Sequence, residues 1–395
     1  MRRYLTVLLL AFLSWQWVSA GKHCTVVVSL DGCRWDYPIW YNTPFLDYMA
    51  SRGVASGLVP SFPSKTFPNH YTLATGLVPD HHGIVANAFV DRESGEVFSL
   101  GNRETKLDGR FYGGEPIWLT ARRQGVRTAV FYWPGSDVEI QGERPDVFYP
   151  YDAERRLTFT ERIDGIVAEL AKPEESRPRL VMAYFEEPDA SGHTFGPQSR
   201  ETRRAVGEMD EMLRQLFFRI QTLPVGDDVN LIVLSDHGMA WVPSDHRIDL
   251  ASLLKPEWVE ASEGGIPEAV YAREGCVDSV YQALRSLDHV RVWRKTDIPA
   301  YLQYGGNSRV GDVVVLPDPG YMIYGGNIPD SGQHGYDPCL TEMHALFRAV
   351  GPDFRHATPP HFPNVDVYPL LCHLLGITPA PSDGSLERVA GMLAF

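Results

Sequence analysis

Cationic side chains are in short supply in this chain. It has 36 Lys and Arg residues against 50 Asp and Glu residues, which gives a formal net charge of -14. Proteins that bind duplex nucleic acid neutralise phosphates with Lys and Arg, so this balance argues against a basic nucleic-acid-binding face. A small anionic substrate stays compatible with it, because bound dications would reverse the electrostatic field locally.

Cysteine is also scarce. The 395 residues contain five cysteines, and no two of them have the C-x-x-C spacing of a thiolate metal site. They are Cys24, Cys33, Cys276, Cys339 and Cys372. An odd number leaves at least one thiol unpaired, and we predict structural roles for all five, with Cys339 and Cys372 as the candidate disulfide.

Long apolar runs are absent after residue 20, where no stretch reaches the roughly 20 residues that a membrane-spanning helix needs. Before it, Arg2 and Arg3 precede the apolar stretch 4–18, and small residues lead to Ala20. This pattern predicts a secretory signal peptide at residues 1–20, cleaved after Ala20. An uncleaved anchor is disfavoured because the stretch is short, and no lipoprotein motif precedes Cys24. We expect a secreted or periplasmic protein without a stable membrane anchor.

Short apolar runs alternate with helical patterns between residue 24 and about residue 239. The Val, Ile and Leu runs at 24–30, 180–185 and 231–235 are typical of buried parallel strands. Helical spacing is found at 42–53, 114–125, 161–170 and 202–223. Strands that alternate with helices indicate right-handed βαβ units. The sequence therefore predicts an α/β fold with a mostly parallel sheet flanked by helices, spanning residues 21–395.

Residues from about 245 to 330 interrupt this alternation. The segments 268–272, 290–293 and 313–316 resemble short strands, and 276–287 resembles a helix, among dense Gly and Pro residues. We predict a small α+β cap inserted into the main domain.

Candidate metal ligands follow the predicted strands. They are Asp31, Thr66, Asp189, His193, Asp236, His237 and His334. In open α/β sheets the functional site lies outside the carboxyl ends of the strands. Imidazole and carboxylate ligands without thiolate favour a catalytic zinc pair over a structural zinc or a calcium site. The combination predicts a two-metal hydrolase, and we expect a zinc phosphohydrolase.

Thr66 precedes the helical pattern 67–75, which has Pro68 in its first turn and ends at Gly76. We expect Thr66 at the helix N-cap, where N–H groups and the helix dipole favour a phosphate. A bound dication can activate such a hydroxyl as a nucleophile. A plain capping threonine is the alternative, and the Asp and His residues favour the nucleophile.

The sequence also predicts the local structure around His193 and His70. Asp189 and His193 are four residues apart, and the intervening Ser191-Gly192 favours a loop over a helical turn. We expect His70 to pack or to hydrogen-bond within the Thr66 helix.

In combination these motifs resemble the nucleotide pyrophosphatase/phosphodiesterases of the alkaline phosphatase superfamily, from about residue 24 to 375. The matching segments are Asp31-Gly32, Lys65-Thr66-Phe67-Pro68-Asn69-His70, Trp133-Pro134-Gly135-Ser136, Glu187-Pro188-Asp189 with Gly192-His193, Ser235-Asp236-His237-Gly238 and His334-Gly335. The resemblance implies an alkaline-phosphatase-like fold and two zinc ions. It implies that one zinc is held by Asp31, Thr66, Asp236 and His237, and the other by Asp189, His193 and His334.

The same resemblance implies residues that bind the substrate. Asn87 would hydrogen-bond a phosphate oxygen. The rings of Phe67, Tyr184 and Tyr151 would surround the nucleotide base, with Tyr149 equally available in place of Tyr151.

We therefore expect a hydrolase that cleaves nucleotide phosphodiester or pyrophosphate bonds and releases 5′-nucleoside monophosphates. Thr66 would attack phosphorus in line and form a covalent threonine intermediate. The first alternative is the same metal site acting on phospholipid-headgroup diesters, phosphonates or phosphate monoesters. A sulfatase is disfavoured because Lys65 stands where its motif has arginine. A non-catalytic zinc-binding protein is disfavoured because no ligand or nucleophile is missing. The sequence makes no prediction of oligomeric state.

Overall fold

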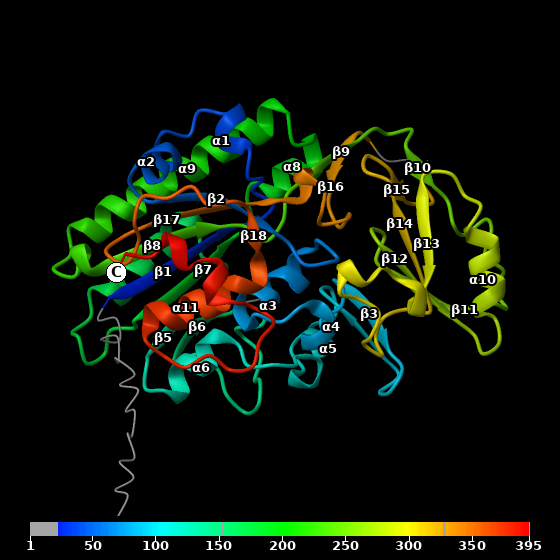
Figure 1. Ribbon diagram of the computed structural model, residues 1–395, viewed down its shortest axis with the longest axis horizontal. Helices are drawn as coiled ribbons and strands as arrows, with labels where there is room; N and C mark the ends of the chain where they lie inside the picture. Colours follow the sequence, from blue (N-terminus) through cyan, green and yellow to red (C-terminus); the bar gives the residue numbers. More distant parts are fainter. Residues whose placement is uncertain (1–22, 152–153, 327–328, 395) are drawn as a thin grey trace, which may run out of the picture.

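A computed structural model of the chain describes residues 23–394 except 152–153 and 327–328. Figure 1 shows a large α/β body with a smaller, mostly β unit beside it. The predicted signal peptide at residues 1–20 lies outside the described residues. Within them, no helix is long and apolar enough to cross a bilayer.

An eight-stranded sheet forms the centre of the large body (Figure 1). Its strands in spatial order are β18 (Phe362–Pro363), β2 (Val54–Val59), β17 (Ala345–Val350), β8 (Val229–Leu234), β1 (Cys24–Leu30), β7 (Leu180–Phe185), β5 (Thr128–Phe131) and β6 (Val147–Tyr149). Only β17 runs antiparallel to its neighbours in this sheet. The predicted mostly parallel sheet is confirmed.

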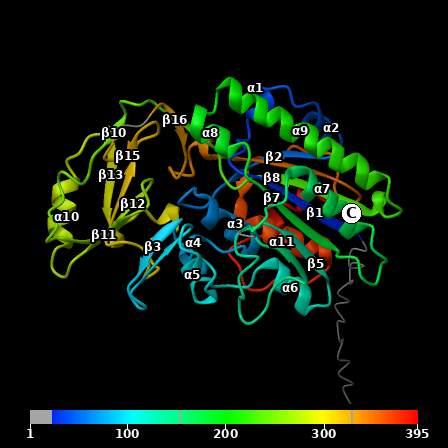
Figure 2. The same ribbon diagram turned by 180° about the vertical axis from the view of Figure 1, so that it is seen from behind.

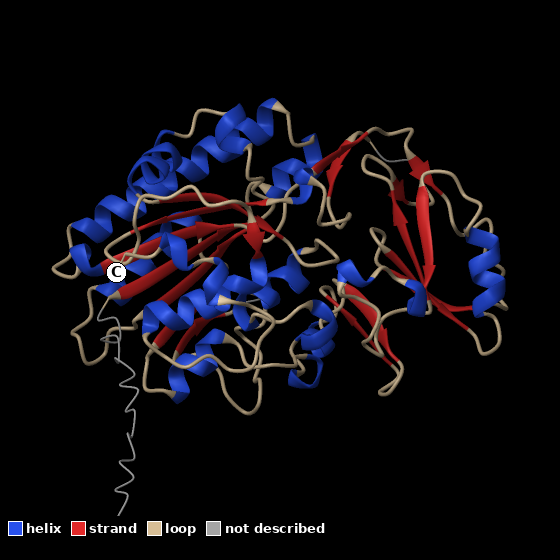
Figure 3. Cartoon of the chain, viewed as in Figure 1, coloured by secondary structure: helices blue, strands red, loops and turns tan. Residues whose placement is uncertain are grey.

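Helices cover both faces of this sheet, as Figures 2 and 3 show. One face carries α1 (Tyr37–Trp40), α2 (Pro44–Arg52), α7 (Phe159–Leu170) and α9 (Arg200–Gln221), and the other α3 (Thr66–Thr75), α6 (Ile117–Arg123) and α11 (Val367–Leu375). Side chains of β1 alternate between the two cores, with Val26 and Val28 in one and Val27 in the other. Because both faces of β1 are buried, its sequence is a nearly continuous apolar run. The four predicted helices are confirmed, with small shifts at their ends.

The smaller unit is a four-stranded antiparallel sheet with helix α10 (Val277–Leu284) packed on it. Its strands in order are β11 (Val259–Glu263), β12 (Glu268–Ala272), β14 (Val313–Pro317) and β13 (Val290–Arg294). The three strands and the helix predicted for the cap are therefore present. The boundaries 245–330 stay a prediction.

Short elements connect the two parts. The hairpin β3 (Ala88–Asp91) and β4 (Glu96–Ser99) contacts the small sheet, where the Val90 N–H donates to the Tyr271 hydroxyl at 3.1 Å. Strands β9 (Ala240–Val242) and β16 (Ser331–Gln333) pair where the chain leaves and re-enters the large body. Further short elements are α4 (Pro79–His82), α5 (Arg103–Lys106), β10 (Arg247–Ile248) and β15 (Met322–Ile323).

The candidate disulfide between Cys339 and Cys372 is wrong, because all five cysteines are free thiols. Cys372 is a buried residue of α11 in the core, whereas Cys339 is exposed in a loop. Their nearness in sequence therefore does not bring the two sulfur atoms together.

Candidate active site

The predicted ligands meet at the carboxyl ends of three neighbouring strands. Strand β1 lies between β8 and β7, and Ser29 is in register with both Leu234 and Tyr184. Asp31 directly follows the end of β1, and Asp236 stands two residues after the end of β8. The Asp189 N–H donates to the Asp31 carbonyl at 3.0 Å. Parallel strands that end together bring these side chains to one edge of the sheet, as the sequence predicted.

Gly32 makes this close approach sterically feasible. Its φ of +63° lies in the left-handed region, and a Cβ there would stand 2.7 Å from Asp189 Oδ1. Its N–H donates to Asp236 Oδ1 at 3.2 Å. Any larger residue would be strained in the backbone and would displace Asp189.

The ligands form two groups, and within each group the ligand atoms lie within 4.8 Å of one another. One group is Asp31, Asp236 and His237, all buried, and the other is Asp189, His193 and His334, of which only His334 is buried. The Thr66 hydroxyl lies 3.2 Å from His237 Nε2 and so joins the buried group. This is the division that the family resemblance implies.

Each of the three histidines turns Nε2 toward the site. Nδ1 donates to a backbone carbonyl in all three: His193 to Gly332 at 2.8 Å, His237 to Gly238 at 2.9 Å and His334 to Ser64 at 2.8 Å. A carbonyl only accepts, so Nδ1 carries the proton and the neutral ring keeps a lone pair on Nε2. The Nε2 atoms of His193 and His334 are 3.1 Å apart. Two lone pairs at this distance repel unless a cation is bound between them.

The carboxylates also require a cation. Asp31 Oδ1, Asp189 Oδ1 and Asp236 Oδ2 are buried without a hydrogen-bond partner. Burial raises the pKa of Asp31 well above its usual range, and the charges of Asp236 and Asp189 raise it further. Although burial acts to raise the pKa of Asp236, His237 and His70 hold it below its usual value. Buried carboxylates with open oxygens and imidazole lone pairs fit two dications with N and O ligands.

Thr66 lies one position further into its helix than predicted. It is the first residue of α3, and the N-cap is Lys65, whose extended backbone (φ -118°, ψ 153°) starts the helix one residue earlier. The Thr66 hydroxyl therefore makes no capping bond and is directed to His237. His70 donates from Nδ1 to the Thr66 carbonyl at 2.9 Å, which confirms the expected contact within the helix.

The loop predicted between Asp189 and His193 is wrong. Residues Asp189–Phe195 form the short helix α8, so the four-residue spacing places both ligands on one helical face. Gly192 within α8 packs against Met239, and a Cβ there would lie 3.0 Å from the Met239 methyl group. Tight packing explains this glycine, which the sequence pattern indicated as a loop residue.

A cavity of about 420 Å³ adjoins the two ligand groups. All four predicted substrate-binding residues, Phe67, Asn87, Tyr151 and Tyr184, line it. Sequence reasoning missed the further lining residues Leu100, Lys106, Tyr132, Asp137 and Arg156. Trp133 and Pro134 also line it, and their segment was noticed only through the family resemblance.

Individual contacts refine the predicted residues. The Asn87 side-chain oxygen accepts from the Phe67 N–H at 3.1 Å, which places its amide at the start of α3. The Tyr184 hydroxyl donates to Asp31 Oδ2 at 2.6 Å, so this ring also supports a candidate ligand. Tyr149 stacks on Phe131 at 4.4 Å away from the cavity, whereas Tyr151 lines it. The structure thus favours Tyr151 over Tyr149.

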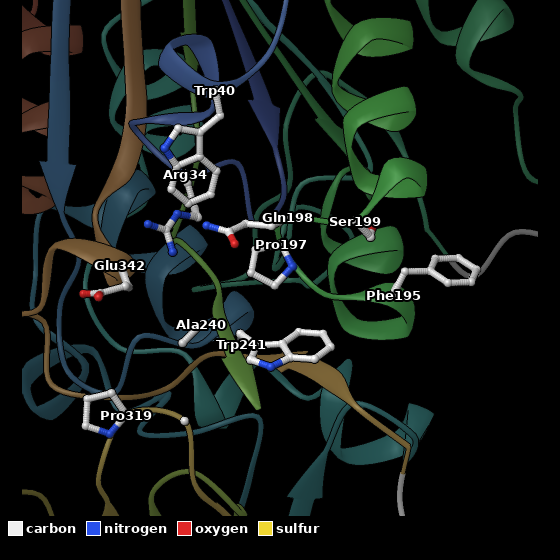
Figure 4. Close-up of a pocket in the computed structure, with 11 residues that line it drawn as sticks. Arg34, Trp40, Phe195, Pro197, Gln198, Ser199, Ala240, Trp241, Pro319 and Glu342 are labelled. Carbon is white, nitrogen blue, oxygen red and sulfur yellow. The ribbon is translucent and has the colours of Figure 1, made fainter. Parts of the chain in front are cut away.

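A second cavity, of about 630 Å³, lies away from the ligand groups (Figure 4). Its walls include Trp40 and Trp241, with the Arg34 guanidinium beside Trp40. Arg34 is buried and already donates two hydrogen bonds to Asp36, both at 2.8 Å. Neither candidate ligand group lines this larger cavity. The candidate active site is therefore the smaller cavity.

Comparison with known proteins identifies the family to which the chain belongs. The family model described as type I phosphodiesterase / nucleotide pyrophosphatase matches residues 25–337. The chain belongs to this family. It is accordingly an enzyme, a hydrolase of the nucleotide pyrophosphatase/phosphodiesterase type, as the sequence predicted.

Two relatives show how much of the chain is shared. Ectonucleotide pyrophosphatase/phosphodiesterase family member 5 of Homo sapiens is 35% identical over 374 residues, which cover 93% of this chain and 77% of that protein. Bis(5′-adenosyl)-triphosphatase enpp4 of Xenopus laevis is 36% identical over 374 residues, covering 93% of this chain and 81% of that protein.

Solved structures agree. Human ectonucleotide pyrophosphatase/phosphodiesterase 5 superposes with a TM-score of 0.88 at 34% identity and covers 94% of this chain and 99% of its own. An inactive threonine-to-alanine variant of the murine protein, in complex with AMP, also has a TM-score of 0.88 at 34% identity, covering 94% of this chain and 100% of its own. The match confirms the predicted alkaline-phosphatase-like α/β fold.

Proposed function

We propose that this enzyme is a two-zinc hydrolase of nucleotide phosphodiesters and pyrophosphates that releases 5′-nucleoside monophosphates through a covalent Thr66 intermediate. One juxtaposition carries the proposal. The Thr66 hydroxyl lies 3.2 Å from His237 Nε2, between two carboxylate–imidazole groups and a cavity lined by aromatic rings.

The ligand sets divide as follows in this proposal. Asp31, Asp236 and His237, together with Thr66, would hold one zinc, and Asp189, His193 and His334 the other. Zinc would lower the pKa of a bound hydroxyl or water and neutralise charge on the phosphoryl oxygens.

The protein residues supply the rest of the reaction. Thr66 Oγ forms a bond to phosphorus while the bond to the leaving oxygen breaks, with the two oxygens in line. Water then attacks phosphorus from the vacated side, the bond to Thr66 Oγ breaks, and the nucleotide leaves with the hydroxyl restored. The Asn87 amide, placed at the start of α3, would donate to a phosphoryl oxygen. Phe67 and Tyr151 would hold the base by stacking.

Relatives support the details. The murine relative was rendered inactive by a threonine-to-alanine change and solved with AMP, which agrees with a threonine nucleophile and a 5′-nucleotide ligand. The name of the Xenopus relative denotes cleavage of a dinucleoside triphosphate. We further propose export to the periplasm or cell exterior, because residues 1–20 have the pattern of a signal peptide.

A substrate panel tests the proposal. Purified protein is assayed on ATP, a dinucleoside polyphosphate, a choline phosphodiester and a simple phosphomonoester, with chelator and after zinc is restored. We expect fast hydrolysis of the two nucleotide substrates, release of a 5′-monophosphate and loss of activity with chelator. Faster hydrolysis of the choline diester or the monoester would move the assignment to one of the alternative substrate classes.

Metal analysis tests the cofactor separately. We expect two zinc ions per chain in the active protein. A single calcium or magnesium ion in the active protein would contradict the two-zinc assignment.

A further inference from the structure

Arg162 of α7 is a buried cation that the proposed reaction does not use. Its side chain is 1% exposed, and it forms a two-pronged pair with Glu186: Nη1 donates to Oε2 at 2.8 Å and Nη2 to Oε1 at 3.0 Å. It does not line the cavity, but its neighbours do. Burying an arginine costs desolvation free energy, which its hydrogen bonds and ion pair must offset. The groups that Arg162 binds therefore indicate its role.

The guanidinium binds backbone on two segments of the cavity wall. Nη1 donates to the Tyr184 carbonyl at 2.7 Å, at the end of β7, and Nε donates to the Leu157 carbonyl at 3.3 Å. The Tyr184 ring lines the cavity, and its hydroxyl donates to Asp31. Arg162 thereby ties the end of β7 to Leu157.

A third segment is held by stacking. The Arg162 guanidinium carbon lies 4.5 Å from the centroid of the Tyr132 ring, and the Tyr132 hydroxyl accepts from the Leu157 N–H. Tyr132 is a non-glycine residue with φ +62°, a strained conformation that persists only where neighbours enforce it. Its ring meets the Tyr151 ring edge-on at 5.7 Å. Arg162 therefore supports Tyr132, which in turn supports Tyr151.

We propose that Arg162, paired with Glu186, is a positioning residue that sets the aromatic wall receiving the nucleoside. The inference rests on the proposed function, in which Tyr151 stacks on the base. The hydrogen bonds of the Arg162 guanidinium go to Leu157, Tyr184 and Glu186, none of which belongs to a ligand group. Its replacement should therefore change nucleoside binding and leave the chemistry at phosphorus unchanged.

Arginine suits this role and lysine does not. The four bonds of Arg162 run from three nitrogens of one rigid planar fork to a carboxylate and two carbonyls. A lysine ammonium is a compact point charge that cannot reach all of them while also stacking on Tyr132. Arg162→Lys therefore keeps the charge and removes the positioning.

The test compares two substrates that differ only in the nucleoside. Arg162→Lys and Glu186→Gln are assayed on a nucleoside 5′-(p-nitrophenyl phosphate) and on methyl p-nitrophenyl phosphate. The matched control is Arg219→Lys. Arg219 of α9 pairs with Asp164 of α7, the helix that carries Arg162, at 2.7 Å, but the Arg219 side chain is exposed. Zinc content and thermal unfolding are measured for each variant.

We expect KM for the nucleoside ester to rise about tenfold in Arg162→Lys, the scale of losing one base–aromatic stack. Glu186→Gln should shift KM the same way by less, because Arg162 keeps its backbone bonds. The kcat/KM for the methyl ester, the zinc content and the control should stay unchanged.

Two results would overturn the inference. Equal losses on both esters with reduced zinc would show that the pair acts through the Asp189 segment instead. An unchanged nucleoside KM in folded variants would show a purely structural role. If Arg162→Lys does not fold, Glu186→Gln decides between the same outcomes. A wild-type enzyme that does not prefer the nucleoside ester would instead contradict the proposed function.

Discussion

The two candidate half-sites differ in how they are embedded. In the first, the side chains of His237 and Asp236 are 0% exposed and that of Asp31 is 3% exposed, and they follow central strands of the sheet. In the second, His193 is 33% and Asp189 15% exposed. The second set comes from the short helix α8 and from the segment after β16, at the junction with the smaller unit. The same chemistry is thus built once inside the core and once on peripheral elements.

This difference has consequences for function. Ligands at strand ends share the rigidity of the sheet, so we call the set Asp31, Asp236 and His237 the rigid half. Thr66 lies beside His237 in this half. We call the set Asp189, His193 and His334 the open half. Its short helix and loop should unfold locally more easily than the sheet, since peripheral elements have lower local stability. Under the proposed function, the nucleophile would be held in a fixed geometry, while the open half would exchange metal, water and leaving group with solvent.

The largest effect should come from the rigid half. Thr66→Ala removes the proposed nucleophile and should lower kcat at least about 1,000-fold. Folding should stay close to wild type, because the Thr66 side chain makes no capping bond. Zinc content should also stay close to wild type, because Asp31, Asp236 and His237 remain as ligands. Steady-state rates with metal analysis and thermal unfolding check this. Near-normal hydrolysis by the variant would rule out the covalent threonine mechanism.

A matched pair of histidine variants separates the half-sites directly. His193→Ala and His237→Ala should each weaken zinc binding by about 100-fold or more, at least the loss seen when a ligand's hydrogen-bond partner is removed. Added imidazole and excess zinc should restore activity in His193→Ala, because the vacated space is open to solvent. The buried position of His237 should remain inactive under the same conditions. Equal rescue of both variants would show that the half-sites are equally accessible.

The cavity wall should show a smaller and substrate-dependent effect. Phe67→Ala and Tyr151→Ala should each lower kcat/KM for a nucleoside ester about tenfold, as expected for one stacked base, and spare a small aryl diester. Tyr184→Ala should lower both substrates, because the Tyr184 hydroxyl donates to Asp31. Assays of the three variants on the two substrates check this. If Phe67→Ala and Tyr151→Ala lose equally on both substrates, the rings do not form a base pocket.

The smallest effect should appear as a pH dependence of the chelated protein. Without metal, the pKa of Asp31 is raised by burial and by the charges of Asp236 and Asp189. A raised folded-state pKa means that the folded state binds more protons than the unfolded state. Stability therefore falls as pH rises from the ordinary Asp pKa, near 4, through the raised value.

Thermal unfolding checks this between about pH 4 and pH 8, a range that spans the ordinary Asp pKa. Tm of the chelated protein should fall by a few degrees across it, and Asp31→Asn should flatten the slope. The zinc-loaded protein should not show this fall, since bound metal replaces the proton. Identical slopes with and without chelator would contradict the expectation.

The sequence by itself determined the parallel sheet, the four main helices and the elements of the smaller unit. Continuous apolar runs and helical periodicity report burial locally, so neighbouring residues contain that information. It also indicated that Asp31 and Asp236 would meet, because parallel strands end at one edge.

Only the tertiary structure decided those features of the candidate site that depend on contacts between residues distant in sequence. Asp189–His193 is helical, and Gly192 within this helix packs against Met239, a partner far away in sequence. The choice of Tyr151 over Tyr149 depended on the stack with Phe131 of another strand. For two of the three histidines, the Nε2 lone pair depends on a carbonyl from a distant segment, because His193 donates to Gly332 and His334 to Ser64. Local pattern carries no information on these partners, because the fold of the whole chain brings them together.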